Sequence, residues 1–250
     1  MTPRWRDFAR SWWRTFAVQG SWNYDTWIGA GIAYCLVPLL RRIYAGDPVA
    51  LRASLRRNLE PFNAHPYLAG LAVGAIARAE MEEVDPERLA RFRTALTGPL
   101  GSLGDRAVWA TWRPVCLLAA IAAYLIGLPA VWSVMLFLAV YNVGHVALRV
   151  WAFRTGWSAG LGVGPALRVE WLERGPVRLV PLVLLLIGLD VALLGRRVFE
   201  LAGTGLPTAL APVAVVAAIA AFRWPRRMGR VAIGLILAIP VAWWLIGVFG

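Results

Sequence analysis

Apolar stretches of unequal length alternate with short polar segments along the chain. In the first half, the uncharged stretches 26–40 and 61–77 are shorter than the roughly 20 residues that a spanning helix needs. Glycine and proline interrupt both stretches, a pattern typical of re-entrant helical hairpins in membrane proteins. The first half of the chain therefore predicts two such hairpins.

The longest uncharged run covers residues 114–148 and is too long for one spanning helix. Because proline lacks a backbone N–H, the Gly127-Leu128-Pro129 sequence predicts an interruption of this run. Two packed half-helices or a tight helical hairpin are then expected. A Gly-rich basic segment, 149–178, follows.

The C-terminal third contains three further apolar stretches, 179–195, 201–222 and 231–250. The last two are long enough to span a bilayer, whereas Asp190 makes the first marginal. We expect Asp190 to pair with Arg196 or Arg197 near a membrane surface, because a lone carboxylate is costly inside a bilayer. By the positive-inside rule, the C-terminus is external, since four arginines immediately precede the last stretch: Arg223, Arg226, Arg227 and Arg230.

The N-terminal segment carries aromatic residues at helical spacing and arginines on the other faces. The aromatic positions are Trp5, Phe8, Trp12 and Phe16, and the basic ones are Arg6, Arg10 and Arg14. This pattern predicts an amphipathic helix lying in the membrane interface. An ordinary helix packed on the rest of the protein fits the pattern equally well. Both interpretations place the N-terminus in the cytoplasm.

Residues 80–96 predict a solvent-exposed helix. Asp85 is a suitable N-cap, Pro86 suits the first helical position, and Gly98 lies just past the expected end. The acidic cluster Glu80–Glu83 is interpreted as a solvated helix end.

Composition supports a membrane protein. Hydrophobic residues make up 59% of the 250 residues, charged residues make up 16%, and the mean hydropathy is +0.61. A soluble domain carries about a quarter charged residues. The net charge is +12, and the arginines flank apolar runs without forming a nucleic-acid module, so lipid headgroups are the better partner. Cys35 and Cys116 lie in apolar runs and are expected to be small buried residues.

Together these patterns predict an all-α polytopic membrane protein. It would have an interfacial amphipathic N-terminal helix (1–20), a core with re-entrant helical hairpins and interrupted helices (21–178), and C-terminal transmembrane helices (179–250). No cleavable signal peptide is predicted.

One candidate site is the sequence RNLEPFNAHP at residues 57–66. Asn63 and His65 offer hydrogen-bonding groups, and Pro61 and Pro66 disfavour a continuous helix around them. Such a polar hairpin tip suits a hydroxyl-rich solute, because free backbone groups at membrane depth are tolerated only in protein or beside water. Alternatively, Asn63 and His65 satisfy local backbone groups in a tight turn.

A second candidate is the Gly-rich stretch TGPLGSLGDRAVW at residues 97–109. We expect an irregular loop here, because glycine and proline disfavour a regular helix. It is not a phosphate-binding P-loop, since it has no lysine and the glycine spacing differs.

Taken in order, these stretches resemble one family. SWNYD at 21–25, RNLEPFNAHP at 57–66, MEE at 81–83 and GPLGSLGD at 98–105 are similar to motifs of the IID membrane subunit of the mannose-fructose-sorbose type of bacterial phosphoenolpyruvate-dependent sugar phosphotransferase system. Trp109 and Pro114 fall at matching offsets, and the resemblance covers about residues 15–165.

The resemblance implies a transport subunit of the bacterial inner membrane that pairs with a IIC subunit, as a trimer of IIC–IID heterodimers. A hexose would move inward and be phosphorylated by IIB, which IIA charges. This chain would carry no catalytic residue, metal or cofactor, and His145 would be a satisfied packing histidine. The implied substrate-binding residues are Asn63, His65, Asn23 and Ala64, and the implied structural loop contains Gly98, Pro99, Gly104 and Asp105, with Asp105 pinning the loop and Asn23 bracing the first hairpin.

The chain also departs from the family pattern, at Thr26, Ile28, Asn58, Pro61 and Ala64. Several of these changes remove hydrogen-bonding groups, and the loss of one donor costs about 1–3 kcal/mol where its partner stays buried. They motivate an alternative function, a degenerate IID-like scaffold or regulatory subunit that moves no sugar. A membrane hydrolase or metal enzyme is disfavoured, because two histidines 80 positions apart supply no metal-ligand spacing.

Overall fold

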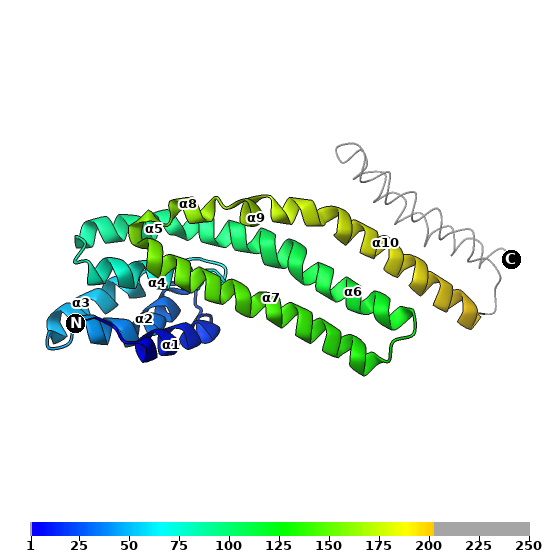
Figure 1. The fold of residues 1–250 in the computed structure, drawn as a ribbon, viewed down its shortest axis with the longest axis horizontal. Coiled ribbons are helices and arrows are strands. Elements are labelled where there is room, and N and C mark those ends of the chain that lie inside the picture. Colours follow the sequence, from blue (N-terminus) through cyan, green and yellow to red (C-terminus); the bar gives the residue numbers. More distant parts are fainter. Residues whose placement is uncertain (1, 203–250) are drawn as a thin grey trace. The chain divides into compact units, whose positions relative to one another are not determined.

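The computed structural model describes residues 2–202, in which the regular elements are helical (Figure 1). The long helices are α1 (Trp5–Arg14), α2 (Gly29–Ile43), α3 (Pro48–Leu59), α4 (Ala69–Met81), α5 (Pro86–Gly104), α6 (Arg113–Leu125), α7 (Ala130–Ala159) and α10 (Gly175–Ala202). The short elements are 3-10 turns at Thr15–Ala17 and Gly160–Gly162, a π-helical segment at Asp105–Trp112, α8 (Gly164–Leu167) and α9 (Glu170–Glu173).

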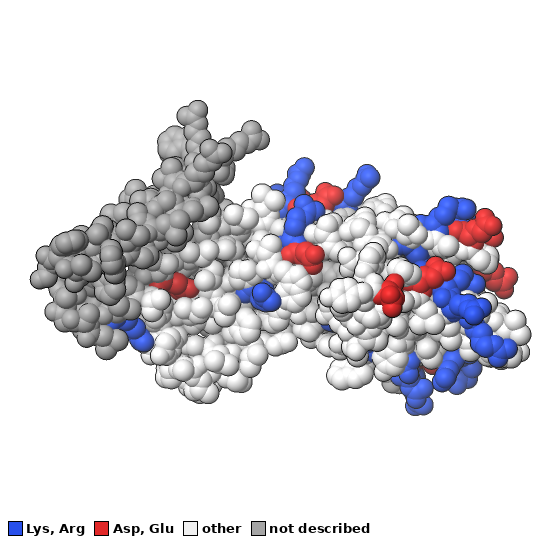
Figure 2. All heavy atoms as spheres, turned by 180° about the vertical axis from the view of Figure 1, so that it is seen from behind, with Lys and Arg blue, Asp and Glu red and all other residues white. Residues whose placement is uncertain are grey.

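Within residues 2–202, three helical stretches are long and apolar enough to cross a membrane: Pro86–Leu125, Ala130–Gly162 and Gly175–Arg197. This confirms the predicted all-α membrane class. The chain divides into two compact units, one of Met1–Trp112 with Ala139–Val177 and the other of Arg113–Leu138 with Arg178–Gly250. On the face shown in Figure 2, charged side chains gather over the first unit and are few over the described part of the second. Exposed Ile126, Val131 and Leu185 of the second unit suit contact with lipid.

The core of the first unit is built on the two short apolar helices α2 and α4. Leu36 and Leu39 of α2 and Leu71 and Ile76 of α4 are all fully buried. A helix that is apolar on every side is stable only when it is enclosed. The helices within these stretches are short, at 15 residues for α2 and 13 for α4, and each follows an irregular segment. Helix α4 is enclosed along most of its length, whereas α2 leaves Tyr34 46% exposed.

Small residues bring α4 and α7 into close contact. A Cβ atom on Gly74 would lie 2.5 Å from the carbonyl oxygen of Phe153, and one on Gly156 would overlap the carbonyl of Leu71. Glycine at these positions lets the two backbones approach, as in other membrane helix pairs. The result is a tightly packed contact between α4 and α7.

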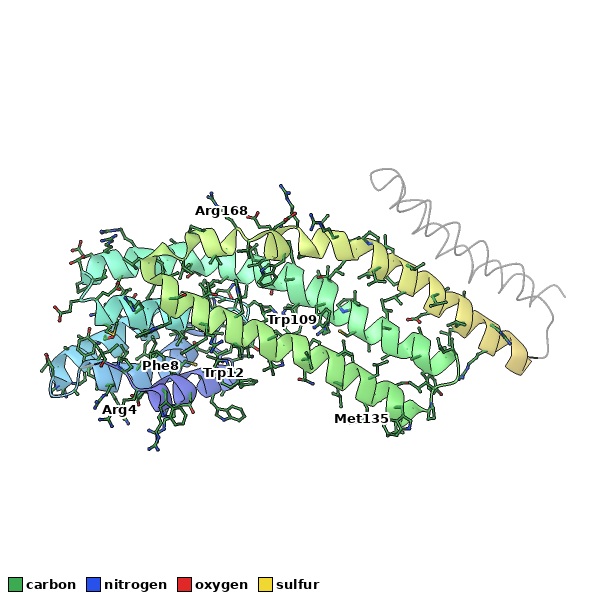
Figure 3. The ribbon with its side chains drawn as sticks, viewed as in Figure 1. Arg4, Phe8, Trp12, Trp109, Met135 and Arg168 are labelled. Atoms are coloured by element: carbon green, nitrogen blue, oxygen red, sulfur yellow. The ribbon has the colours of Figure 1, made fainter. Side chains whose placement is uncertain are left out.

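The N-terminal helix has one face packed on the protein and one exposed face. One side packs on the first unit, where the buried Ser11 hydroxyl donates to the Cys35 carbonyl at 2.6 Å and Phe8 meets the ring of Trp157. On the other side, Trp5 and Trp13 are 72% and 68% exposed. Figure 3 labels Phe8 and Trp12 on this helix. Packing on the protein is therefore confirmed for one face, and the remaining face stays suited to an interface.

Helix α5 begins where the sequence predicts but ends later than predicted. Asp85 accepts the Arg88 N–H at 3.0 Å and Pro86 occupies the first turn. The helix continues past Gly98 to Gly104, and a π-helical segment leads into α6, so the predicted loop at 97–109 is wrong. Because Pro99 has no N–H, the carbonyl of Ala95 lacks a helical donor. This carbonyl lies on an exposed turn, where water can donate to it. The irregularity appears instead as wider π-helical turns.

The break in the longest apolar run is confirmed. Helix α6 ends at Leu125 and α7 begins at Ala130. Gly127 between them has φ +115°, a conformation that glycine adopts readily. The run therefore forms two helices joined by a short turn.

The predicted pairing of Asp190 is not formed within the described residues. Both carboxylate oxygens of Asp190 are buried without a hydrogen-bond partner there, and Arg197 instead donates to the Tyr124 carbonyl at 3.4 Å. The apolar stretch 201–222, apart from its first two residues, lies outside the described residues. The stretch 231–250 and the arginines between Arg223 and Arg230 also lie outside them. The orientation of the termini stays a prediction.

Candidate functional site

Two sequence motifs that lie far apart along the chain meet in the first unit. The Phe62 N–H donates to the Thr26 carbonyl at 3.2 Å, and the Ile28 N–H donates to the Phe62 carbonyl at 3.1 Å. Trp27, between these contacts, has φ +52°, in the left-handed region. This short bridge fixes the segment 21–28 beside the segment 61–66.

Asn23 organises the turn that enters α2. Its Oδ1 accepts the N–H groups of Asp25 at 3.0 Å and Thr26 at 2.8 Å, and its Nδ2 donates to the Thr26 hydroxyl at 2.9 Å. These contacts form an Asx turn. The Asn23 amide is thus engaged in bracing the backbone rather than turned to a ligand.

His65 is buried at the junction of the two candidate stretches. It is 1% exposed, its backbone N–H donates to the Leu100 carbonyl at 3.2 Å, and its ring lies against Gly104. Its Nδ1 accepts the Tyr67 N–H at 3.2 Å, which leaves the proton of the neutral ring on Nε2. Within the described residues, Nε2 has no hydrogen-bond partner.

The environment of His65 keeps its ring uncharged. Burial, and secondly the charge of Arg149, lowers the pKa of His65 to about 4. A neutral imidazole at physiological pH suits a packing and positioning role.

Asn63, two residues earlier, points the other way. It is exposed, and Nδ2 lies 3.6 Å from the position that a Cβ atom on Gly101 would occupy. Among residues 2–202, no hydrogen bond of the Asn63 side chain is found. Ala64 between them is 4% exposed. The segment therefore presents an amide outward and buries an imidazole inward, so the two predicted binding residues do not face one site.

The other predicted loop residues lie along α5 and the start of the π-helical segment. Gly98 and Pro99 are exposed, and a Cβ on Gly98 would meet nothing within 4 Å. Asp105 is also exposed, and the described part of the chain provides no ion pair for its carboxylate. Among these loop residues, only Gly104 lies so close to a neighbouring side chain that the position requires glycine.

Sequence reasoning missed an aromatic and basic cluster next to His65. The Tyr67 ring stacks on His145 with centroids 4.0 Å apart, and its hydroxyl lies 2.6 Å from that of Tyr141. Trp109, labelled in Figure 3, lies 5.0 Å from the His65 ring. The i, i+4, i+8 spacing of Tyr141, His145 and Arg149 was the available signal, because these positions share one helix face.

Arg149 connects this cluster to the N-terminal segment. Its Nε donates to His145 Nε2 at 2.7 Å, and a terminal nitrogen donates to the Thr15 carbonyl at 2.5 Å. The guanidinium also lies 4.8 Å from the centre of the Tyr67 ring. His145 is therefore hydrogen-bonded and packed, as expected of a structural histidine.

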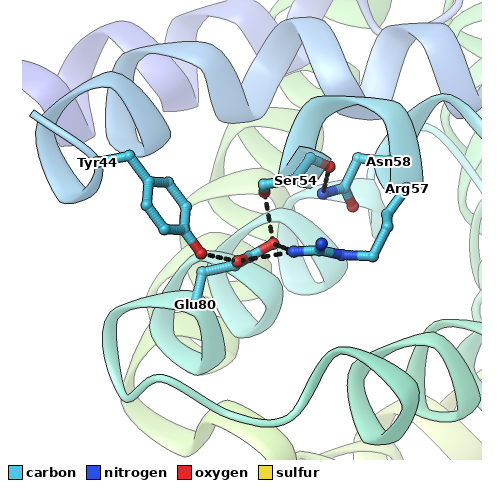
Figure 4. A network of polar contacts seen from close by, with 5 residues as sticks. All are labelled: Tyr44, Ser54, Arg57, Asn58 and Glu80. Carbon is cyan, nitrogen blue, oxygen red and sulfur yellow. Dashed lines mark hydrogen bonds and ion pairs between the residues drawn. The ribbon is translucent and has the colours of Figure 1, made fainter. Parts of the chain in front are cut away.

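A second polar network stabilises the scaffold (Figure 4). The buried Glu80 carboxylate accepts from Ser54 Oγ at 2.5 Å, from Arg57 at 3.1 Å and from the hydroxyl of Tyr44. Burial, together with the hydrogen bond to Glu80, raises the pKa of Tyr44. The interpretation of Glu80 as part of a solvated helix end is wrong, because this carboxylate holds α3 against α4.

The fold and the contact between segments 21–28 and 61–66 define a polytopic helical membrane protein. Its first unit exposes a polar tip, the segment 61–66 that carries Asn63. Residues 4–170 match the family model described as "PTS system mannose/fructose/sorbose family IID component". The chain belongs to this family, where PTS denotes the sugar phosphotransferase system.

Curated relatives agree with the family match. The chain is 31% identical over 155 residues to the mannose-specific EIID component of Escherichia coli K12, covering 60% of this chain and 54% of the relative. It is 31% identical over 157 residues to the sorbose-specific EIID component of Klebsiella pneumoniae, covering 60% and 56%. The chain thus spans about half the length of the curated relatives it matches.

Two solved structures share the fold. One is described as the mannose transporter ManYZ in complex with microcin E492, with a TM-score of 0.60, 21% identity, and coverage of 98% of this chain and 97% of that one. The other, described as the structure of a membrane protein, has a TM-score of 0.70, 22% identity, and coverage of 99% and 98%. At these identities the likeness concerns the fold.

Proposed function

We propose that this chain is the membrane subunit (IID) of a mannose-family sugar phosphotransferase transporter. It would pair with a IIC subunit to translocate a hexose that IIB, charged by IIA, phosphorylates. The family membership supports this proposal, and so do the mannose- and sorbose-specific names of the relatives. The assembly would be a trimer of IIC–IID heterodimers in the bacterial inner membrane, with the N-terminus cytoplasmic and the C-terminus external.

The observation that carries the proposal is the exposed Asn63 amide on a rigidly held tip. Its neighbours Phe62 and His65 are bonded through their backbones to Thr26, Ile28 and Leu100. An amide fixed in this way donates to and accepts from sugar hydroxyls with little loss of conformational entropy. Asn63 is therefore assigned direct contact with the sugar, and His65 is assigned the ordering of the tip. Asn23 braces the entry to α2, and Ala64 packs beneath the tip.

Transport would be elevator-like. A mobile lobe built partly from the two short apolar stretches would hold the sugar against IIC, while the outer helices stay fixed at the trimer interface. The close contacts of α4 with α7 support movement of the first unit as one body, since tightly packed elements move together.

The scaffold alternative rests on the departures at Thr26, Ile28, Asn58 and Ala64. In the structure, Ile28 and Ala64 are buried, and Asn58 donates to the Ser54 carbonyl at 2.9 Å. Thr26 is bonded within the Asn23 turn. Because these side chains serve local packing, the substitutions remove no exposed hydrogen-bonding group from the tip. This favours the transporter over the scaffold.

The test is co-expression with a IIC-like protein encoded beside it, followed by pull-down and binding of mannose and glucosamine to the purified complex. Saturable binding that is lost without this chain supports the proposal. A stable complex that binds neither sugar favours the scaffold, and failure to copurify with IIC overturns the transporter.

A further inference from the structure

A basic groove of about 210 Å³ lies between α1 and α2. Four arginines and one aspartate line it together with two apolar residues: Arg10, Arg14, Arg41, Arg42, Asp7, Val37 and Pro38. The groove therefore combines a strongly cationic wall with an apolar floor.

Two of these arginines hold the walls together. Pro38 has no N–H to donate to the carbonyl of Tyr34, one helical turn earlier, and Arg14 donates to that carbonyl at 2.9 Å instead. Arg14 also lies over the Tyr34 ring at 4.4 Å. Arg42 contacts the Thr2 carbonyl at 3.4 Å. The groove is thus a fixed feature of the α1–α2 contact.

The other two arginines are available to a ligand. Arg10 and Arg41 are exposed, and within the described residues neither forms an ion pair with a carboxylate. Two guanidinium groups facing one groove recognise an oxyanion well, because each offers several N–H donors in a planar fork.

The surroundings identify the source of the oxyanion. Trp5 and Trp13 on the same helix are 72% and 68% exposed, and exposed tryptophans on amphipathic helices lie at headgroup depth. The Val37 and Pro38 floor suits the glycerol and upper acyl region of a lipid, and a free phosphate would gain nothing from it. We propose that this groove binds the headgroup of an anionic phospholipid and thereby anchors α1 at the membrane surface.

The test uses the full chain in complex with its membrane partner, delipidated in detergent and studied by native mass spectrometry. Phosphatidylglycerol and phosphatidylcholine with the same acyl chains are the probes. The variant Arg10→Gln/Arg41→Gln removes the groove charges. Its control, Arg52→Gln/Arg56→Gln, removes the same charge from the exposed face of α3.

The expected result is a loss of about tenfold in phosphatidylglycerol affinity for the groove variant, with the control unchanged and phosphatidylcholine weak throughout. Arg10→Lys/Arg41→Lys should retain part of the affinity, because the charge remains. Equal losses in both glutamine pairs, or no loss in the groove pair, would overturn the site. Displacement of the lipid by millimolar inorganic phosphate would show a free-anion site. That result overturns the lipid assignment and leaves the proposed sugar transport untouched.

Discussion

Gly104 packs directly against the side chain of His65, so closely that a Cβ atom at this glycine would overlap the Cβ of the histidine and lie 2.5 Å from its Cγ. The contact joins the end of α5 to the segment that carries Asn63. Within this motif, Gly104 is needed for close approach between two elements.

Gly104→Ala should destabilise the protein by about 1–3 kcal/mol, because neither the buried ring nor the helix backbone has space to move. Thermal unfolding of the purified complex, followed by tryptophan fluorescence, measures this. Gly98→Ala is the matched control: its site is open, and alanine in an exposed helix is more favourable than glycine by up to about 1 kcal/mol. Equal melting temperatures for the two variants would contradict the packing role of Gly104.

Asn63→Ala should weaken sugar binding by about 1–3 kcal/mol without affecting assembly with IIC, since the amide is exposed and its loss leaves only a sugar hydroxyl unpaired. Calorimetric titration of the complex with mannose and with glucosamine measures the change. The exposed amide of Gln19 provides the control, and Gln19→Ala should bind sugar normally. Unchanged affinity in Asn63→Ala would remove Asn63 from the site.

Local chemistry was sufficient to predict several features of the fold. Asp85 followed by Pro86 begins α5, and the Gly127–Pro129 turn separates α6 from α7, because caps and breaks depend on neighbouring residues. The continuation of α5 through Gly98 and Pro99 was not predictable in this way. It depends on contacts with the segment after α3, which lies far away along the chain.

The candidate site was likewise predictable only in part. The sequence identified Asn63 and His65 as polar residues in an apolar setting, but not that one faces outward and the other is buried. The stacking of Tyr67 on His145 joins positions 78 residues apart, and a single sequence carries no direct signal for it. Burial of Glu80 was missed for a similar reason, because its partners come from α3 and from Tyr44, directly after α2.

Stability should fall between about pH 6.5 and pH 4 because of His65. Its pKa is lowered to about 4 in the folded protein, while the unfolded chain takes up the proton near pH 6.5. The unfolded state therefore binds more protons across this window, so stability is full above it and declines as pH falls, by about 3 kcal/mol in total.

Chemical unfolding of the complex at a series of pH values measures the decline. His65→Asn keeps an acceptor for the Tyr67 N–H but cannot titrate, so its stability should change less across this window. A variant with the same pH dependence as the parent protein would show that the decline originates elsewhere.

Arg149→Lys should loosen the N-terminal segment. Lysine keeps the charge, but it cannot donate simultaneously to His145 and the Thr15 carbonyl with the planar geometry of arginine. A loss of about 1.5–3 kcal/mol is expected. Limited proteolysis of residues 1–28 reports the release directly, and the exposed Arg154→Lys is the control. Equal cleavage of both variants would exclude this linking role.

Glu80→Gln tests whether the buried carboxylate is required by its partners. Ser54, Arg57 and Tyr44 all direct donors at it, and the neutral amide both weakens the Arg57 contact and places an N–H group where a donor already points. Removal of one partner from a buried ion pair costs about 3–5 kcal/mol, and here about 2–4 kcal/mol is expected because Arg57 is 25% exposed. Glu83→Gln, at an exposed site, should change stability by less than about 0.5 kcal/mol. A double-mutant cycle with Arg57→Gln then isolates the pair: a coupling near zero would mean that the hydroxyls of Ser54 and Tyr44 hold the carboxylate, so that α3 is attached to α4 mainly by neutral hydrogen bonds.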